Sequence, residues 1–171
     1  MGIDLGWRRI APQAAAGRTP EDLAELVPSP FDDQYARMVE DRRVVWTDDQ
    51  GVLVGVLLSL CTEGTPYEAG AQAFAQQPPD FDDEEMTGTL DPGTVREIAA
   101  AMAVAEWRTW LRAQFDLVMT FAADAGMDPV AEGAAPEGPW ADHFVRFAEE
   151  LTDLFGRASA DGEAVVVMID A

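Results

Sequence analysis

The sequence has no lysine, and it has only one cysteine and one histidine. The shortage of cysteine and histidine restricts the disulfides and metal sites that the chain can form. Cys61 lies in the apolar run VLLSLC and has no second cysteine within the chain to pair with. We therefore expect a reducing compartment, and a buried hydrophobic role for this side chain. One cysteine and one histidine are too few ligands for a zinc site built from the protein alone. The chain also lacks a P-loop and a GxGxxG motif, so we expect no bound metal, nucleotide or other cofactor.

Long hydrophobic runs are also missing. No stretch approaches the roughly 18 continuous apolar residues that a membrane-spanning helix needs. The opening MGIDLGWRRIAP has neither the basic region nor the apolar region of a secretory signal. These absences predict a soluble, cytoplasmic protein without a membrane partner.

Positive charge is scarce, with 11 arginines against 32 acidic residues and a formal net charge of -21. Phosphate backbones and anionic lipid surfaces repel such a chain, so nucleic acid is excluded as a direct partner. Three interpretations of the acidity stay open. The acid can steer a basic protein partner towards the surface, it can reflect adaptation to high salt, or it can follow from a genome rich in arginine codons.

The pattern of elements predicts one α/β domain over residues 1–171. IDLGWRRIA, residues 3 to 11, is typical of a strand, and the continuous apolar run in EAVVVMID, residues 163 to 170, is typical of a central strand covered on both faces. Capped helices are predicted after Thr19, Ser29 and Asp91, and an amphipathic helix follows Trp140. We expect a small mixed sheet with helices on both faces, in three layers (α+β).

Residues 44 to 64, VVWTDDQGVLVGVLLSLCTEG, allow two interpretations. The abundance of valine favours strand, turn and strand, with the turn at Asp49-Gln50-Gly51. Alternatively, Asp48 caps a helix in which Gly51 and Gly55 allow a neighbouring element to approach closely.

Residues 64 to 91 are expected to form a long irregular loop that contains an acidic run. QQPPDFDDEEMTGTLDPG, residues 76 to 93, holds six acidic residues and no basic one. The run lacks the spaced ligands and the glycine of a calcium loop. We interpret it first as a mobile, solvated loop and second as a docking surface. The candidate binding residues are Asp80, Asp82, Asp83, Glu84 and Glu85.

The opening MGIDLGWRRI, the capped TPEDLAEL, the helix start LDPGTVREIAAAMA and the closing FVRFAEELTDLFGRASADGEAVVVMID together resemble the YfbM-like family of bacterial proteins. This family is defined by a domain of unknown function. The resemblance covers nearly the whole chain, above all residues 1 to 27 and 88 to 170. It implies an α/β sandwich and the helical interpretation of residues 48 to 60, and it implies no established activity.

The chain departs from that family at two places, so no site residue is carried over. Members often carry Lys, Trp and sometimes His in the segment that corresponds to DDQGVLVGVLL, which here contains Asp49, Gln50, Gly51 and Gly55. Members also tend to have Tyr-Pro and Trp after the long helix, where this chain has Asp128-Pro129.

His143 is the only side chain whose ordinary pKa lies near neutrality, which makes it the one catalytic candidate. It is expected in the first turn of the last helix beside Asp142, and no GxSxG nucleophile motif accompanies it. Trp107, Trp110 and Trp140 are interpreted as core residues or, where partly exposed, as binding anchors.

Two functions are therefore compared. The first is a non-catalytic acidic interaction module that docks a basic protein, as immunity and inhibitor proteins do. The alternative is a small-ligand-binding protein or enzyme with a pocket around His143 and at least two converging acids. A monomer and a homodimer are both compatible with the sequence.

Overall fold

Four antiparallel strands form one sheet in the order β2-β1-β4-β3. The computed structural model describes residues 4–127 and 133–170. The strands are β1 (Asp4–Ile10), β2 (Val44–Thr47), β3 (Thr87–Leu90) and β4 (Ala164–Asp170). Both ends of the chain therefore supply the two central strands. The sheet that we expected to be mixed is antiparallel in each of its three pairings.

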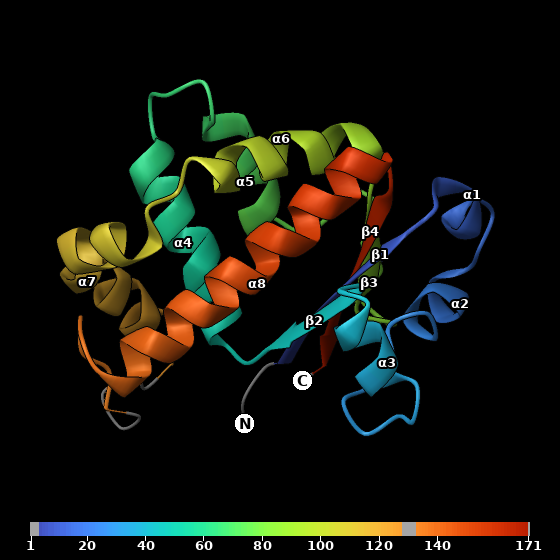
Figure 1. Ribbon diagram of the computed structural model, residues 1–171, viewed down its shortest axis with the longest axis horizontal. Helices are drawn as coiled ribbons and strands as arrows, with labels where there is room; N and C mark the ends of the chain where they lie inside the picture. The colour runs from blue at the N-terminus through green and yellow to red at the C-terminus, as the bar shows by residue number, and fades with distance from the viewer. Residues whose placement is uncertain (1–3, 128–132, 171) are drawn as a thin grey trace.

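Helices cover both faces of this sheet, which confirms the predicted α/β class (Figure 1). The short helices α1 (Pro12–Ala15), α2 (Pro20–Ala24) and α3 (Tyr35–Glu40) lie on one face. The other side of the sheet carries α4 (Gln50–Thr62), α5 (Glu68–Ala75), α6 (Pro92–Ala103) and α8 (Pro139–Asp161), and α7 (Trp107–Asp124) packs against α4 and α8. None of the helices formed by the described residues combines the length and apolarity needed to cross a bilayer.

The valine run of β4 explains the three layers. Val165 and Val167 pack with the α4–α8 side, whereas Val166 packs with Leu23 and Val27 on the other side. Val165 and Val166 are fully buried. Because successive side chains of a strand point to opposite faces, a strand in which every residue is apolar needs cover on both. The prediction of a central C-terminal strand is confirmed.

The ambiguous segment forms a short strand followed by a helix. β2 ends at Thr47, and an Asp48 side-chain oxygen accepts a hydrogen bond from the Gln50 amide at 2.9 Å, just where α4 begins. Gly51 and Gly55 allow close packing, as the helical interpretation expected. A Cβ at Gly51 would lie 3.0 Å from the Trp7 ring, and a Cβ at Gly55 would lie 3.3 Å from the Ala75 backbone.

Two segments differ from the expected pattern. The stretch from 64 to 91 is not continuously irregular, because it contains α5 and β3. A Cβ at Gly70 would collide with the Glu97 carbonyl, so α5 is fixed by contact with α6 rather than by its own helix propensity. The helix expected after Ser29 begins only at Tyr35, because the Asp32 carboxylate accepts from the Ser29 amide and closes a turn first.

The predicted caps of the other helices are present. Thr19 and Asp22 form a reciprocal capping box on α2, and Asp91 accepts from the amides of Gly93 and Thr94 at the start of α6. Helix α8 ends at Gly162 in the left-handed conformation that glycine adopts without strain. Cys61 is half-buried, and burial raises the pKa of its thiol, which suits the expected role of a packed apolar side chain. Asp128-Pro129 lies outside the described residues.

Candidate functional site

His143 lies in the first turn of α8 between one acid and one base. Its Nδ1 is 2.7 Å from Arg146 Nη2, and its Nε2 is 3.6 Å from Asp48 Oδ2. Arginine can only donate, so Nδ1 accepts and the proton of the neutral ring is on Nε2, facing Asp48. The ring also packs edge-on against Phe147, with centroids 4.3 Å apart.

The described residues place one acid, Asp48, against the His143 ring. The enzyme hypothesis requires at least two acids to converge on His143, but Asp48 is the only acid that pairs with it among the residues described. Across residues 4–127 and 133–170, no three side chains of His, Cys, Asp or Glu come together as metal ligands would. Arg146 already occupies the nitrogen that would otherwise act as a base.

The acidic run of residues 80–85 divides into structural and exposed carboxylates. Asp80 Oδ1 accepts from the Thr89 amide at 2.8 Å, and the backbone of Asp82 exchanges two hydrogen bonds with Thr87. The Asp82 side chain accepts from the amides of Glu84 and Glu85, at 2.9 Å each. Asp80 and Asp82 therefore hold the turn against β3. Asp83, Glu84 and Glu85 remain exposed.

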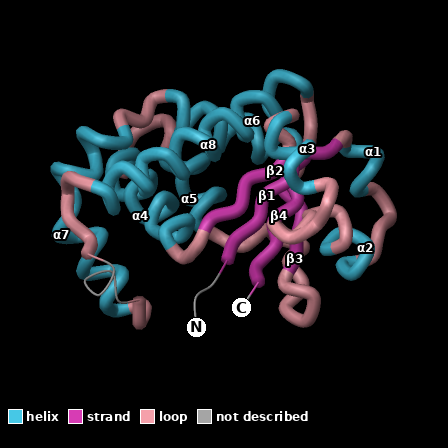
Figure 2. Tube along the Cα trace, turned by 60° about the horizontal axis from the view of Figure 1, so that its bottom comes forward, coloured by secondary structure: helices cyan, strands magenta, loops and turns pink. Residues whose placement is uncertain are grey.

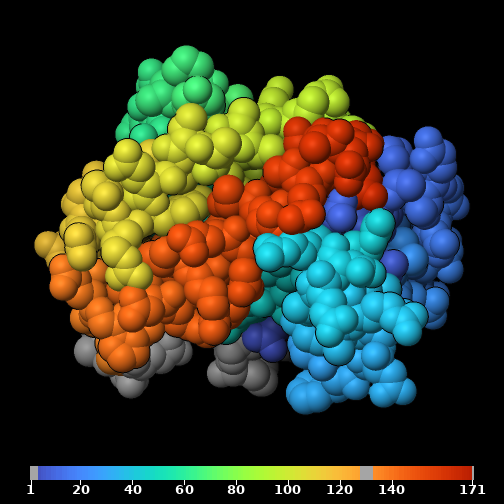
Figure 3. Space-filling model, in the orientation of Figure 1, coloured from blue at the N-terminus to red at the C-terminus, as the bar shows by residue number. Residues whose placement is uncertain are grey.

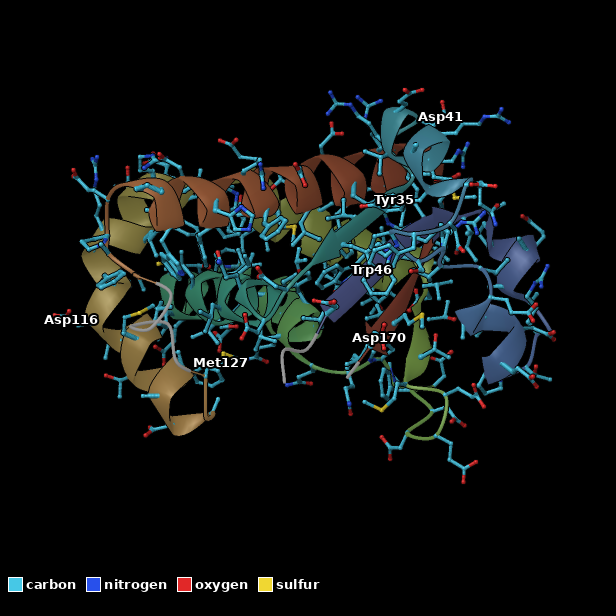
Figure 4. The ribbon with its side chains drawn as sticks, turned by 90° about the horizontal axis from the view of Figure 1, so that it is seen from below. Tyr35, Asp41, Trp46, Asp116, Met127 and Asp170 are labelled. Atoms are coloured by element: carbon cyan, nitrogen blue, oxygen red, sulfur yellow. The ribbon has the colours of Figure 1, made fainter. Side chains whose placement is uncertain are left out.

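The antiparallel sheet gathers further carboxylates at the same end. Asp4 begins β1 and is the direct cross-strand partner of Asp170, which ends β4. Asp48 and Asp49 follow the end of β2, and the Ile169 amide donates to the Met86 carbonyl beside the acidic turn. Figure 4 labels Asp170 at this end of the sheet.

We call this set of side chains the acidic rim. It consists of Asp4, Asp48, Asp49, Asp83, Glu84, Glu85 and Asp170, all exposed or half-buried. The pKa of Asp49 is raised, first because the carboxyl is partly buried and next because Asp48 lies nearby, with a further contribution from Asp4. Repulsion from Asp48 and Asp4 therefore adds to the larger effect of burial on the pKa of Asp49.

The ion pairs that arginines form in the described chain involve acids outside the acidic rim, and the nearest positive charge is that of Arg146, which bonds His143 beside Asp48. Arg9 is buried and pairs with Asp161 at 2.7 Å and Glu163 at 2.8 Å. Arg42 and Arg157 both bind Asp153, at 3.1 and 2.9 Å. In the part of the chain that the structure describes, no arginine forms an ion pair with a rim carboxylate. The rim therefore keeps its negative field.

The three tryptophans proposed as binding anchors are buried or half-buried. Trp107 and Trp140 are each 6% exposed and belong to the larger core. Trp107 donates to the Thr152 hydroxyl at 3.1 Å, and half-buried Trp110 packs edge-on against Trp107. Figure 2 shows α7, which carries Trp107 and Trp110, at the left edge of the molecule, well apart from the loop below β3. The structure therefore does not bring Trp107 and Trp110 together with the acids of that loop.

An apolar pocket of about 160 Å³ opens between the sheet, α4 and α5. Its floor comes from three strands and its walls include Phe74 and Phe81; the floor residues are Leu5, Trp7, Leu90, Val167 and Ile169. Trp7 and Phe74 stack with centroids 5.9 Å apart at 19°. We call this cavity the apolar pocket. His143 does not line it.

A second, more polar cavity of about 340 Å³ lies between α3, β2 and α8. Figure 3 shows α3 and α8 side by side on this face of the molecule. The ion pair between Arg42 and Asp153 lies at its wall, and Tyr35 and Glu150 face it. The pKa of Tyr35 is raised, first by burial and next by the nearby Glu150 carboxylate, which favours the neutral phenol.

Sequence reasoning missed four of the seven residues of the acidic rim and all of the apolar pocket. Asp4, Asp48, Asp49 and Asp170 carry a signal, since each lies at or just beyond an end of a predicted strand, but only the strand pairing shows that they share one end of the sheet. The pocket has no local signature, because its lining comes from distant parts of the chain. No family model, curated protein or solved structure matches this chain.

Proposed function

We propose that the protein is a non-catalytic interaction module that docks a basic protein partner in the cytoplasm, in the manner of an immunity or inhibitor protein. The observation that carries this proposal is the acidic rim, seven carboxylates at one end of the sheet that no arginine of the described residues neutralises. Such a field speeds the encounter with a positively charged protein and rejects an acidic one.

The environment of His143 argues against the enzymatic alternative. A rim spread along four strand ends gives a broad docking surface, whereas a reaction centre needs groups that converge within hydrogen-bond reach. We also propose membership in the YfbM-like family, supported by the helix at residues 50 to 62 and by the two sheet-forming termini. The module acts as a monomer or a homodimer, which sedimentation can distinguish.

Capture of partners from the native lysate tests the acidic rim directly. The immobilised protein should retain basic proteins at low ionic strength and release them as salt rises, because counter-ions screen the rim. Neutralising three exposed rim residues, with Asp83→Asn, Glu84→Gln and Glu85→Gln, should reduce the retained amount at least about 5-fold, since the loss spans several charges. Quantitative mass spectrometry of the eluates measures the change.

A matched control removes three charges at other places. Asp116→Asn, Asp124→Asn and Glu149→Gln change exposed acids on α7 and α8, and they leave the net charge equal to that of the rim variant. Figure 4 shows Asp116 far from Asp170. The control should retain partners like the unmodified protein. Equal losses in the two variants, or an empty low-salt capture, would refute the proposal.

A further inference from the structure

The apolar pocket has the shape of a site for one side chain. Its floor is the α4–α8 face of the sheet, and residues 74 to 81 form a wall that comes from the end of α5 and the following loop. Its volume of about 160 Å³ is comparable to the roughly 150 Å³ of a cavity that accepts benzene. A phenylalanine or leucine side chain therefore fills it, and a larger ligand does not.

Glycines keep the pocket open and its wall in place. Gly51 and Gly55 line the pocket from α4, where a larger residue would occupy space beside Trp7 and Phe74. Gly88 of β3 lies under the loop, and a Cβ there would be 3.0 Å from both Pro78 and Phe81. Protein interiors contain few voids larger than a water molecule, so a walled apolar pocket of this size indicates a binding site.

Carboxylates lie at the end of the sheet next to this pocket, and in the described chain none of them lines it. No charged residue of the described chain lines it, but Leu5, Phe81 and Ile169 each adjoin an acid in the sequence. Those acids are Asp4, Asp82 and Asp170, and two of them belong to the acidic rim. A peptide segment with one apolar side chain and a positively charged residue on each side matches this arrangement. The apolar side chain is buried in the pocket, while the charged groups stay in solvent near the rim.

From this geometry we propose that the apolar pocket receives an apolar anchor residue of the partner, phenylalanine or leucine in size, flanked by arginine or lysine. This inference rests on the proposed function and adds the centre of the interface to it. Interface energy concentrates in such buried anchors, while the surrounding charges steer the approach and set the salt dependence.

Three blocked pentapeptides test the proposal by calorimetry at low salt. The probes are Arg-Arg-Phe-Arg-Arg, Arg-Arg-Ala-Arg-Arg and Gln-Gln-Phe-Gln-Gln. The phenylalanine peptide with arginines should bind about 10-fold more tightly than its alanine counterpart, because only phenylalanine fills the pocket. The neutral peptide should bind more weakly than the charged phenylalanine peptide, and only the charged peptides should lose affinity as salt is added.

A pair of Ala→Phe variants on α5 locates the binding. Ala75 is exposed and lines the pocket, so Ala75→Phe should fill the mouth and reduce the affinity for the phenylalanine peptide to that of the alanine peptide. Ala69 is exposed on the same helix and does not line the pocket, so Ala69→Phe should leave both affinities unchanged. NMR resonances of the Trp7 indole in the unmodified protein give an independent readout. They should shift when the arginine-flanked phenylalanine peptide is added and should not shift with the alanine peptide.

The outcomes separate the two proposals. Equal, salt-dependent affinities of the two arginine peptides would overturn the pocket proposal and leave the acidic rim as the docking surface. Equal affinities of the neutral and charged phenylalanine peptides would overturn the requirement for flanking cations. If neither arginine peptide bound at low salt, both the pocket proposal and the proposed function would fail.

Discussion

At the residue scale, carboxylates that look alike in the sequence have different partners in the fold. Asp80 accepts from a β3 amide and Asp82 closes a turn, whereas Asp83 to Glu85 face solvent. β3 is an edge strand, and its outward amides at Thr87 and Thr89 are occupied by Asp82 and Asp80. Occupied amides cannot donate to another chain, so the acidic turn also protects the β3 edge of the sheet from pairing with another strand.

Asp91 offers a test of a single carboxylate. Its pKa is lowered, first by the hydrogen bond from the Thr94 hydroxyl and also by the backbone amides of Gly93 and Thr94. A lowered folded-state pKa means that the carboxylate stabilises the fold fully above its unfolded pKa, about 3.9, and loses this effect as pH falls through the folded value. Asp91→Ala should lower the unfolding free energy by about 1 kcal/mol at pH 7.

Denaturant unfolding at pH 7 and at pH 3 measures this prediction. The difference between the unmodified protein and Asp91→Ala should shrink at the lower pH. Asp91→Asn keeps an acceptor for the cap and loses the charge, so it should cost less than alanine at pH 7 and show no pH dependence of its own. A penalty for Asp91→Ala that stayed constant down to pH 3 would contradict the role of the ionised group.

At the element scale, close contacts with neighbouring elements determine which segments form helices. The sequence around α4 is compatible with strand or helix, and contact with the sheet and α5 selects the helix. The same reason applies to α5, whose Gly70 rests on the backbone of α6. A short helix gains most of its stability from packing and not from propensity, so the element depends on its neighbours.

Two glycine-to-alanine changes test this reasoning. Gly51→Ala would place a Cβ against the Thr47 side chain and the Trp7 ring, so we expect a loss of about 1–3 kcal/mol in unfolding free energy. Gly156 lies exposed inside α8, and a Cβ added there would meet open space, so Gly156→Ala should instead stabilise by about 1 kcal/mol. Thermal and denaturant unfolding measure both; a gain from Gly51→Ala would be inconsistent with the close contact.

At the scale of the whole molecule, charge is distributed unevenly along the sheet. The arginine pair Arg8 and Arg9 lies near one end of β1, and the acidic rim lies at the other. Asp4 and Asp170, directly opposite each other in the sheet, are a repulsive pair. With a net charge of -21, repulsion opposes the compact state, and the Asp4–Asp170 pair adds to it at the end where the partner is proposed to dock.

Salt should stabilise this protein. Raising NaCl from about 0.01 M to 1 M shortens the screening length from about 30 Å to about 3 Å, which weakens repulsion between exposed carboxylates more than it weakens the buried pairs of Arg9. We expect the melting temperature to rise by several degrees, and Asp170→Asn should show a smaller rise. Calorimetry over this range measures the change, and a falling melting temperature would show that surface ion pairs dominate.

Local pattern and composition were enough to predict the α/β class, the central position of the C-terminal strand, the caps at Thr19 and Asp91 and the acidic character of the chain. Contacts between distant segments were needed to establish that α4 and α5 are helices, that His143 lacks a second acid among the described residues, and that Asp4, Asp48 and Asp170 share one end of the sheet. Strand pairing and helix packing join residues far apart in the chain, and no short stretch of sequence records which distant residues will meet.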